Sequence, residues 1–216
     1  MIKIKEKKFD EIVDSIEGFK KILVIGCGGC ASVCLGGGQK EVERLCVNLN
    51  QFFQSEAPSR SARGYTIERQ CNIAFIEETR SFINLFDAVL SMACGAGSQY
   101  LAEIYPDTPI FPAVNTVAIG IDREIGVYEE KCRACGDCVV GYTGGVCPVT
   151  RCAKGIFNGP CGGTNNGSCE IDKNIPCAWV DIFNRLKVQD RLGNIMKIRP
   201  TMEWQNQTQR TVVQNR

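Results

Sequence analysis

The sequence of 216 residues contains 14 cysteines, whose thiols can bind metals, form disulfides or carry out redox chemistry. Cys27, Cys30 and Cys34 lie in one glycine-rich segment, directly after the apolar run at 22–25. The start of the chain lacks the apolar region of a signal peptide, so we expect a reducing compartment in which cysteines bind metals. A secreted scaffold held by disulfides is the alternative.

The sequence contains no histidine. This excludes histidine-ligated zinc, Rieske clusters, and Ser-His or Cys-His catalytic pairs. No acid and base stand at a recognisable motif spacing either. What remains is sulfur chemistry, so the sequence favours a protein that carries electrons on metal cofactors.

Two further cysteines, Cys71 and Cys94, each follow a predicted strand. Because ligands of parallel sheets bind beyond the carboxyl ends of the strands, five thiols are expected to converge there. A 4Fe-4S cluster takes four cysteine ligands. We predict the ligands Cys27, Cys30, Cys34 and Cys94, with Cys71 either a substitute ligand or a neighbouring thiol that supports the site.

A second group of eight cysteines lies in residues 132–177. Cys132, Cys135 and Cys138 have the first three spacings of a bacterial ferredoxin site, and Cys147 precedes a proline as a ferredoxin ligand does. Eight residues rather than three separate Cys138 from Cys147, so the fourth ligand stays open. The remaining thiols are Cys152, Cys161, Cys169 and Cys177. Eight thiolates would fill two sites, of which the second fits another 4Fe-4S cluster or a tetrahedral zinc.

Two patterns compete with metal binding. The segment Gly26-x-Gly28-x-x-Ala31 fits the dinucleotide fingerprint, but the expected acidic residue about 20 positions on is missing, and thiols would crowd a pyrophosphate. Cys46 lies on the apolar stripe of a predicted helix, so we expect it to belong to the core.

Alternating strand and helix patterns precede the second cysteine group, which predicts an α/β domain over residues 1–127 with a Rossmann-like parallel sheet. Helices are expected at 9–16, 42–53, 76–86 and 100–104, and strands at 22–25, 65–68, 88–92 and 110–114. Residues 128–193 are expected to form a ferredoxin-like, irregular module. It lacks apolar periodicity except in a predicted helix at 178–192, which is expected to end at Gly193, so the module should need metal to fold. Residues 194–216 are expected to form an extended C-terminal arm, anchored by Trp204, or else a disordered tail.

The net charge of +1 indicates no nucleic-acid or lipid partner, and no apolar stretch approaches the roughly 20 residues of a membrane span. We therefore expect a soluble, cytoplasmic protein.

The chain resembles a known family, the small iron-sulfur subunit (zinc-finger-like, C-terminal-domain type) of bacterial methylenetetrahydrofolate reductase, as in acetogens. The resemblance runs through most of the chain and rests on five segments: residues 24–30 with the glycines at 36–38, Arg69-Gln70-Cys71, Ala93-Cys94-Gly95, residues 147–154 and residues 159–163.

The resemblance implies that the subunit passes electrons to the flavin of a separate TIM-barrel catalytic subunit, which reduces methylenetetrahydrofolate to methyltetrahydrofolate in one-carbon metabolism of the Wood-Ljungdahl type. The number of thiols predicts two 4Fe-4S clusters, or three, with zinc as the alternative for one of them. Further electron-transfer subunits are compatible partners. A zinc-binding structural subunit without a redox role is the competing interpretation.

Overall fold

The computed structural model describes residues 1–204, 209 and 211–214. The chain divides into two compact units. Unit 1 consists of Met1–Ala118 with Asp122–Tyr128, and unit 2 of Ile119–Ile121 with Glu129–Arg216. Residues 205–208, 210 and 215–216 of the predicted arm lie outside the described residues. Among those described, no helix is both long and apolar enough to span a lipid bilayer.

Unit 1 is built on a parallel four-stranded sheet, which confirms the predicted α/β class. The strands lie in the order β3-β2-β4-β5. Strand β2 is apolar because both of its faces are covered, as in parallel sheets generally. The strands are β2 (Lys21–Cys27), β3 (Ser61–Ile67), β4 (Ala88–Ser91) and β5 (Ile110–Pro112).

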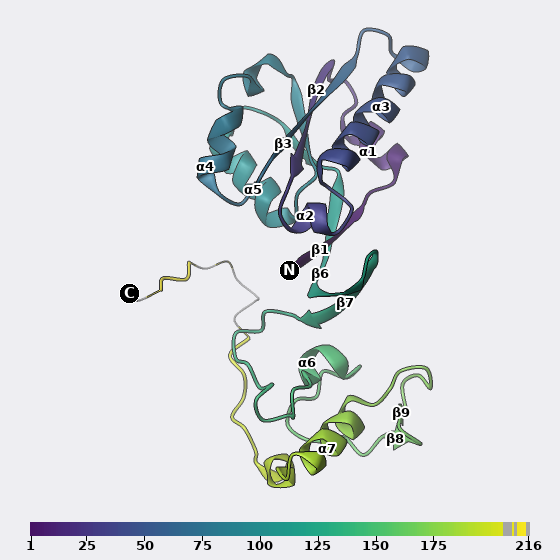
Figure 1. Cartoon of the computed structure of the whole chain (residues 1–216), viewed down its shortest axis with the longest axis vertical. Coiled ribbons are helices and arrows are strands. Elements are labelled where there is room, and N and C mark those ends of the chain that lie inside the picture. The colour runs from purple at the N-terminus through teal and green to yellow at the C-terminus, as the bar shows by residue number, and fades with distance from the viewer. Residues whose placement is uncertain (205–208, 210, 215–216) are drawn as a thin grey trace. The chain divides into compact units, whose positions relative to one another are not determined.

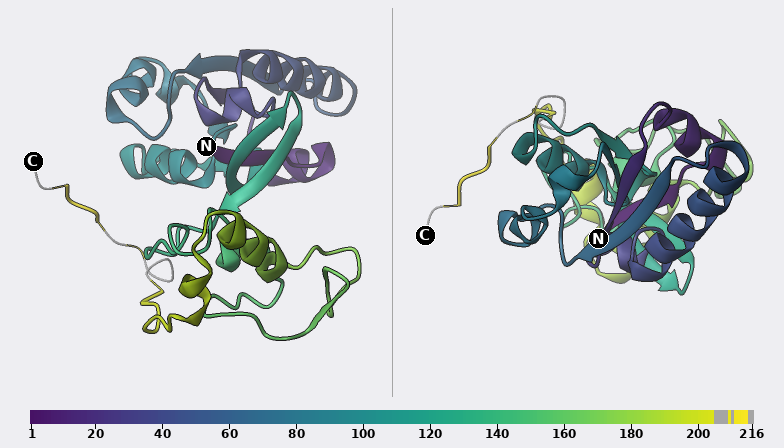
Figure 2. Two further views of the ribbon diagram at one scale, coloured as in Figure 1. Left: turned by 60° about the horizontal axis from the view of Figure 1, so that its bottom comes forward. Right: turned by 90° about the horizontal axis from the view of Figure 1, so that it is seen from above.

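Helices cover both faces of this sheet (Figures 1 and 2). Helices α1 (Phe9–Ser15) and α3 (Gln39–Glu56) pack on one face, and α5 (Gly95–Ile104) covers the other with the short turns after β3. Helix α3 forms where the sequence predicts it, since its apolar stripe is buried against the sheet. The buried stripe consists of Val42, Leu45, Leu49 and Phe53.

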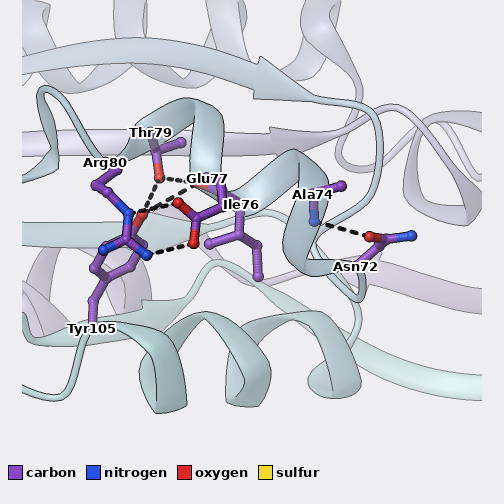
Figure 3. A network of polar contacts seen from close by, with 7 residues as sticks. All are labelled: Asn72, Ala74, Ile76, Glu77, Thr79, Arg80 and Tyr105. Carbon is purple, nitrogen blue, oxygen red and sulfur yellow. Dashed lines mark hydrogen bonds and ion pairs between the residues drawn. The ribbon is translucent and has the colours of Figure 1, made fainter.

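The helix predicted for residues 76–86 is not continuous. The segment forms α4 (Ile73–Ile76) and two 3₁₀ turns, η1 (Glu77–Thr79) and η2 (Ile83–Leu85). Polar contacts explain the difference (Figure 3). The Asn72 carboxamide accepts a hydrogen bond from the N–H of Ala74 (3.0 Å), and the Thr79 hydroxyl donates to the carbonyl of Ile76 (2.8 Å). The Asn72 bond caps the N-terminus of α4, so the segment becomes helical at Ile73. The Thr79 bond, to the residue three positions earlier, competes with the continuation of the helix.

Three segments for which no strand was predicted form a second sheet, in the order β1-β6-β7. These strands are β1 (Ile2–Glu6), β6 (Val114–Glu124) and β7 (Val127–Cys132). In β1 the side chain of Lys3 is buried and pairs with Asp122. Lysine is rarely buried without a partner, so the residue type gives no sign that this position is interior.

Unit 2 has little regular structure, and the described part contains a small apolar cluster around α7 (Ala178–Val188). The other elements are α6 (Pro148–Arg151), β8 (Thr164–Asn165), β9 (Ser168–Cys169) and the 3₁₀ helix η3 (Leu192–Met196). Helix α7 ends before the predicted Gly193. Asp190 adopts a left-handed conformation (φ 53°), and the N–H of Arg191 reaches back to the carbonyl of Leu186 (2.8 Å), which closes the helix as a Schellman motif does.

Candidate metal centres

Three thiols gather at the carboxyl-end edge of the unit 1 sheet. Cys27 is the last residue of β2, Cys71 follows β3, and Cys94 is the N-cap of α5. Burial raises the pKa of the Cys71 thiol, and the negative charge that Cys27 and Cys94 would carry raises it further. Three thiolates this close repel one another, and a bound metal cluster would relieve that repulsion.

A buried glutamine fixes the backbone beside Cys71. The Gln70 carboxamide donates to the carbonyls of Ile25 (2.8 Å) and Gly26 (3.2 Å) and accepts from the Ser91 hydroxyl (2.6 Å). The Ser91 hydroxyl also lies 2.8 Å from that of Ser98. The network thus joins β2, β4 and α5 at the residue that precedes Cys71. Sequence reasoning gave Gln70 no such role, although it stands in the segment that carries the family resemblance.

Further contacts anchor the segment that follows Cys71 (Figure 3). The Tyr105 hydroxyl, just beyond α5, lies 3.1 Å from that of Thr79 and donates to the carbonyl of Ile76 (3.2 Å). These bonds hold the α4 region to the end of the helix that Cys94 caps.

The glycines after Cys34 are required by close packing. A Cβ on Gly37 would lie 1.9 Å from the carbonyl oxygen of Met92, so only glycine fits. The Gly37 carbonyl accepts a hydrogen bond from the N–H of Cys27 (2.8 Å). Residues 36–38 therefore hold the loop against the ends of β2 and β4.

The other two predicted ligands of this site are placed differently. Cys30 begins α2 (Cys30–Val33) and is partly exposed. Cys34, at the end of α2, is buried, and its thiol donates to the carbonyl of Ile2 (3.3 Å) in β1. The structure thus groups Cys71 with Cys27 and Cys94, and directs Cys34 toward β1. Cys46 packs against the core, and burial raises its pKa to about 11.

In unit 2, Cys132 ends β7 and its sulfur accepts a hydrogen bond from the N–H of Ala134 (3.3 Å). The Thr150 hydroxyl lies within hydrogen-bond distance of both the Cys147 sulfur (3.5 Å) and the carbonyl of Lys131 (3.4 Å). Cys147 is therefore held beside the end of β7. Cys135 and Cys138 lie in the loop after β7, where the Cys135 thiol donates to the carbonyl of Asp137 (3.7 Å).

The remaining four cysteines of unit 2 line one cavity of about 640 Å³. They come from separate elements: Cys152 follows α6, Cys161 lies in the loop before β8, Cys169 ends β9, and Cys177 is the N-cap of α7. Apolar side chains, including that of Trp179, form much of the remaining wall.

The surroundings of Cys161 lower the pKa of its thiol. The N–H of Gly163 (3.4 Å) and the Lys154 ammonium group (3.7 Å) both donate to its sulfur, and the two interactions lower its pKa. The positive φ of Gly162 (77°) turns the chain so that the N–H of Gly163 meets the sulfur. A thiolate is the form that binds metals.

Within the described residues, no group of three or more His, Cys, Asp or Glu side chains is close enough to hold a single metal ion. A 4Fe-4S cluster spreads its four cysteine ligands over four iron atoms, so its thiolates stand further apart than the ligands of one zinc ion. The N–H groups that point at the sulfurs of Cys132 and Cys161, and the four thiols around one cavity, fit such a cluster.

Comparison with known families identifies a relation for the C-terminal half. Residues 111–205 match the family described as methylene-tetrahydrofolate reductase C terminal. The matched stretch contains all eight cysteines of residues 132–177. It relates the chain to methylenetetrahydrofolate reductase proteins. Neither a curated protein nor a solved structure matches the chain.

Proposed function

We propose that this protein is an iron-sulfur electron-transfer subunit of a methylenetetrahydrofolate reductase. Its partner would be a separate flavin-containing TIM-barrel subunit, which reduces methylenetetrahydrofolate to methyltetrahydrofolate. One observation carries the proposal: four cysteines from separate elements line one cavity, within the stretch that matches the reductase family. Iron-sulfur clusters, when bound, accept and release single electrons.

The chain's own residues would serve this role in three ways. Cysteines bind the metal, with Cys132, Cys135, Cys138 and Cys147 as one set in unit 2 and the four cavity thiols as the other. Backbone N–H groups donate to the sulfurs, as at Cys161, and so stabilise their negative charge. Apolar walls limit the access of water, which influences the reduction potential.

In unit 1 we propose a third site at the end of the sheet. The gathering of Cys27, Cys71 and Cys94 supports Cys71 as a ligand, with Cys30 the partly exposed thiol in the neighbouring loop. A Cys34 ligand would first require its bond to the carbonyl of Ile2 to break.

The test is electron transfer to the flavin. The protein is reduced anaerobically, freed of excess reductant and mixed with the catalytic subunit, while flavin absorbance is followed. We expect rapid bleaching with the unaltered protein and with Cys46→Ala, which removes a core thiol. Cys161→Ser and Cys135→Ser should slow bleaching. Loss of a cluster signal in Cys135→Ser without any change in flavin reduction by the physiological donor would contradict the proposed electron path.

A zinc-binding structural subunit is the second candidate, because four thiolates are also the ligand set of a structural zinc. To hold one zinc ion, the four thiols that line the cavity would have to move closer together. Zinc has no redox chemistry, so a colourless protein that holds zinc and leaves the flavin oxidised would favour it.

A further inference from the structure

The start of the C-terminal arm is bound to unit 2 by a set of specific contacts. The Asn158 side chain donates to the carbonyl of Arg199 (2.8 Å) and accepts from its N–H (2.9 Å), so one amide pairs with both backbone groups. Further along, Met202 is buried, and Trp204 meets the ring of Phe157 edge-on with centroids 6.2 Å apart. Residues 199–204 therefore have a defined course across unit 2.

The Arg199 side chain reaches the loop between two predicted cluster ligands. Its guanidinium group lies 3.5 Å from the carboxylate of Asp137, which stands between Cys135 and Cys138. It also stacks over the ring of Tyr142, 4.3 Å from the centroid. The Arg199 side chain is 21% exposed, whereas the side chain of Asp137 is 49% exposed and Tyr142 is 48% exposed, so both interactions are partly open to water on the side of the loop.

That loop needs external support. Ala134 has φ 51° and Gly136 has φ 92°, and a left-handed conformation is unfavourable for alanine. The conformation of Ala134 directs its N–H at the sulfur of Cys132 (3.3 Å). The left-handed conformation of Ala134 and the N–H···S bond therefore depend on one another. Arg199 contacts this turn through its ion pair with Asp137.

We propose that Arg199 is a positioning residue for the site formed by Cys132, Cys135, Cys138 and Cys147. It holds the loop through Asp137, and its positive charge raises the reduction potential of that site, because reduction adds negative charge nearby. The inference rests on the proposed function, and it assigns a role to the C-terminal arm within the chain itself.

Opposite shifts of potential distinguish this role from a purely structural one. In Arg199→Gln the cation is lost, so the midpoint potential should fall. In Asp137→Asn the anion is lost and Arg199 keeps its charge, so the potential should rise. Both changes break the ion pair, and a purely structural role would move the potential in the same direction in both.

The experiment uses the full-length protein, purified anaerobically, with an EPR-monitored redox titration and amide hydrogen exchange of residues 133–139. Lys197→Gln is the matched control, since it removes an equal charge from an exposed side chain two residues away. We expect exchange about threefold faster in Arg199→Gln, as for the loss of one partly exposed ion pair, and little change in the control.

Equal potentials in Arg199→Gln and Lys197→Gln, or shifts of the same sign in Arg199→Gln and Asp137→Asn, would overturn the claim about potential. Unchanged exchange in Arg199→Gln would overturn the positioning role. If the protein holds zinc and no sulfide, the proposed function fails together with the claim about potential, while the exchange measurement still decides whether Arg199 holds the loop.

Discussion

Replacement of Gln70 by Glu tests whether the buried amide network builds the edge of the unit 1 sheet. The change preserves size but exchanges the amide NH₂ group for an oxygen. Two hydrogen bonds, to the carbonyls of Ile25 and Gly26, are lost, and oxygen then faces oxygen in a fully buried site. Each lost bond costs about 0.5–1.5 kcal/mol, and the unpaired buried groups add to this, so the free energy of unfolding should fall by about 3 kcal/mol.

Circular dichroism during urea unfolding is the appropriate assay. Both tryptophans, Trp179 and Trp204, belong to unit 2, so their fluorescence reports on that unit alone. Gln99→Glu is the matched control, because Gln99 is exposed on α5 and donates one bond to the carbonyl of Gly95. If Gln70→Glu were as stable as Gln99→Glu, the network would not be what fixes Cys71.

Three further predictions follow from single contacts. Gly37→Ala should destabilise unit 1 by about 3 kcal/mol or more in urea unfolding, because its Cβ would overlap a carbonyl, whereas Gly193→Ala, with open space around it, should be tolerated. Trp179→Phe removes a bond to the carbonyl of Ile156 (2.9 Å) and should cost unit 2 about 1 kcal/mol, seen as an earlier transition in Trp204 fluorescence. Alkylation of Cys46, followed by mass spectrometry, should rise with a midpoint near pH 11, because burial favours the protonated thiol and only the thiolate reacts. A midpoint at the pH of a free thiol would show that Cys46 is not buried.

The sheet of unit 1 was predictable from the sequence because its strands are short apolar runs between helical stripes. The apolar run at 22–25 predicts a buried strand, and the apolar stripe from Val42 to Phe53 predicts a helix that packs on it. Strand β1 was missed because Lys3 is buried through its pairing with Asp122, far away in sequence. The turns after β3 were missed because local polar bonds, such as that of Thr79, decide their form.

The thiols of unit 1 were predictable as a group, because the sequence places Cys27, Cys71 and Cys94 after parallel strands. The hydrogen-bond network around Gln70, which fixes the backbone beside Cys71, was not predictable from spacing. In unit 2, nothing in the spacing of Cys152 and Cys177 reveals that they line one cavity, because folding of the irregular loops brings them together.

Metal and sulfide analysis of anaerobically purified protein shows whether the cysteines hold iron-sulfur clusters. Iron, acid-labile sulfide and zinc per chain are measured together with an EPR spectrum after reduction by dithionite. We expect about twelve irons with matching sulfide and cubane-type signals, since each of the three proposed 4Fe-4S clusters contributes four of each. Zinc alone, without sulfide or an EPR signal, would contradict this expectation and leave a structural subunit as the function.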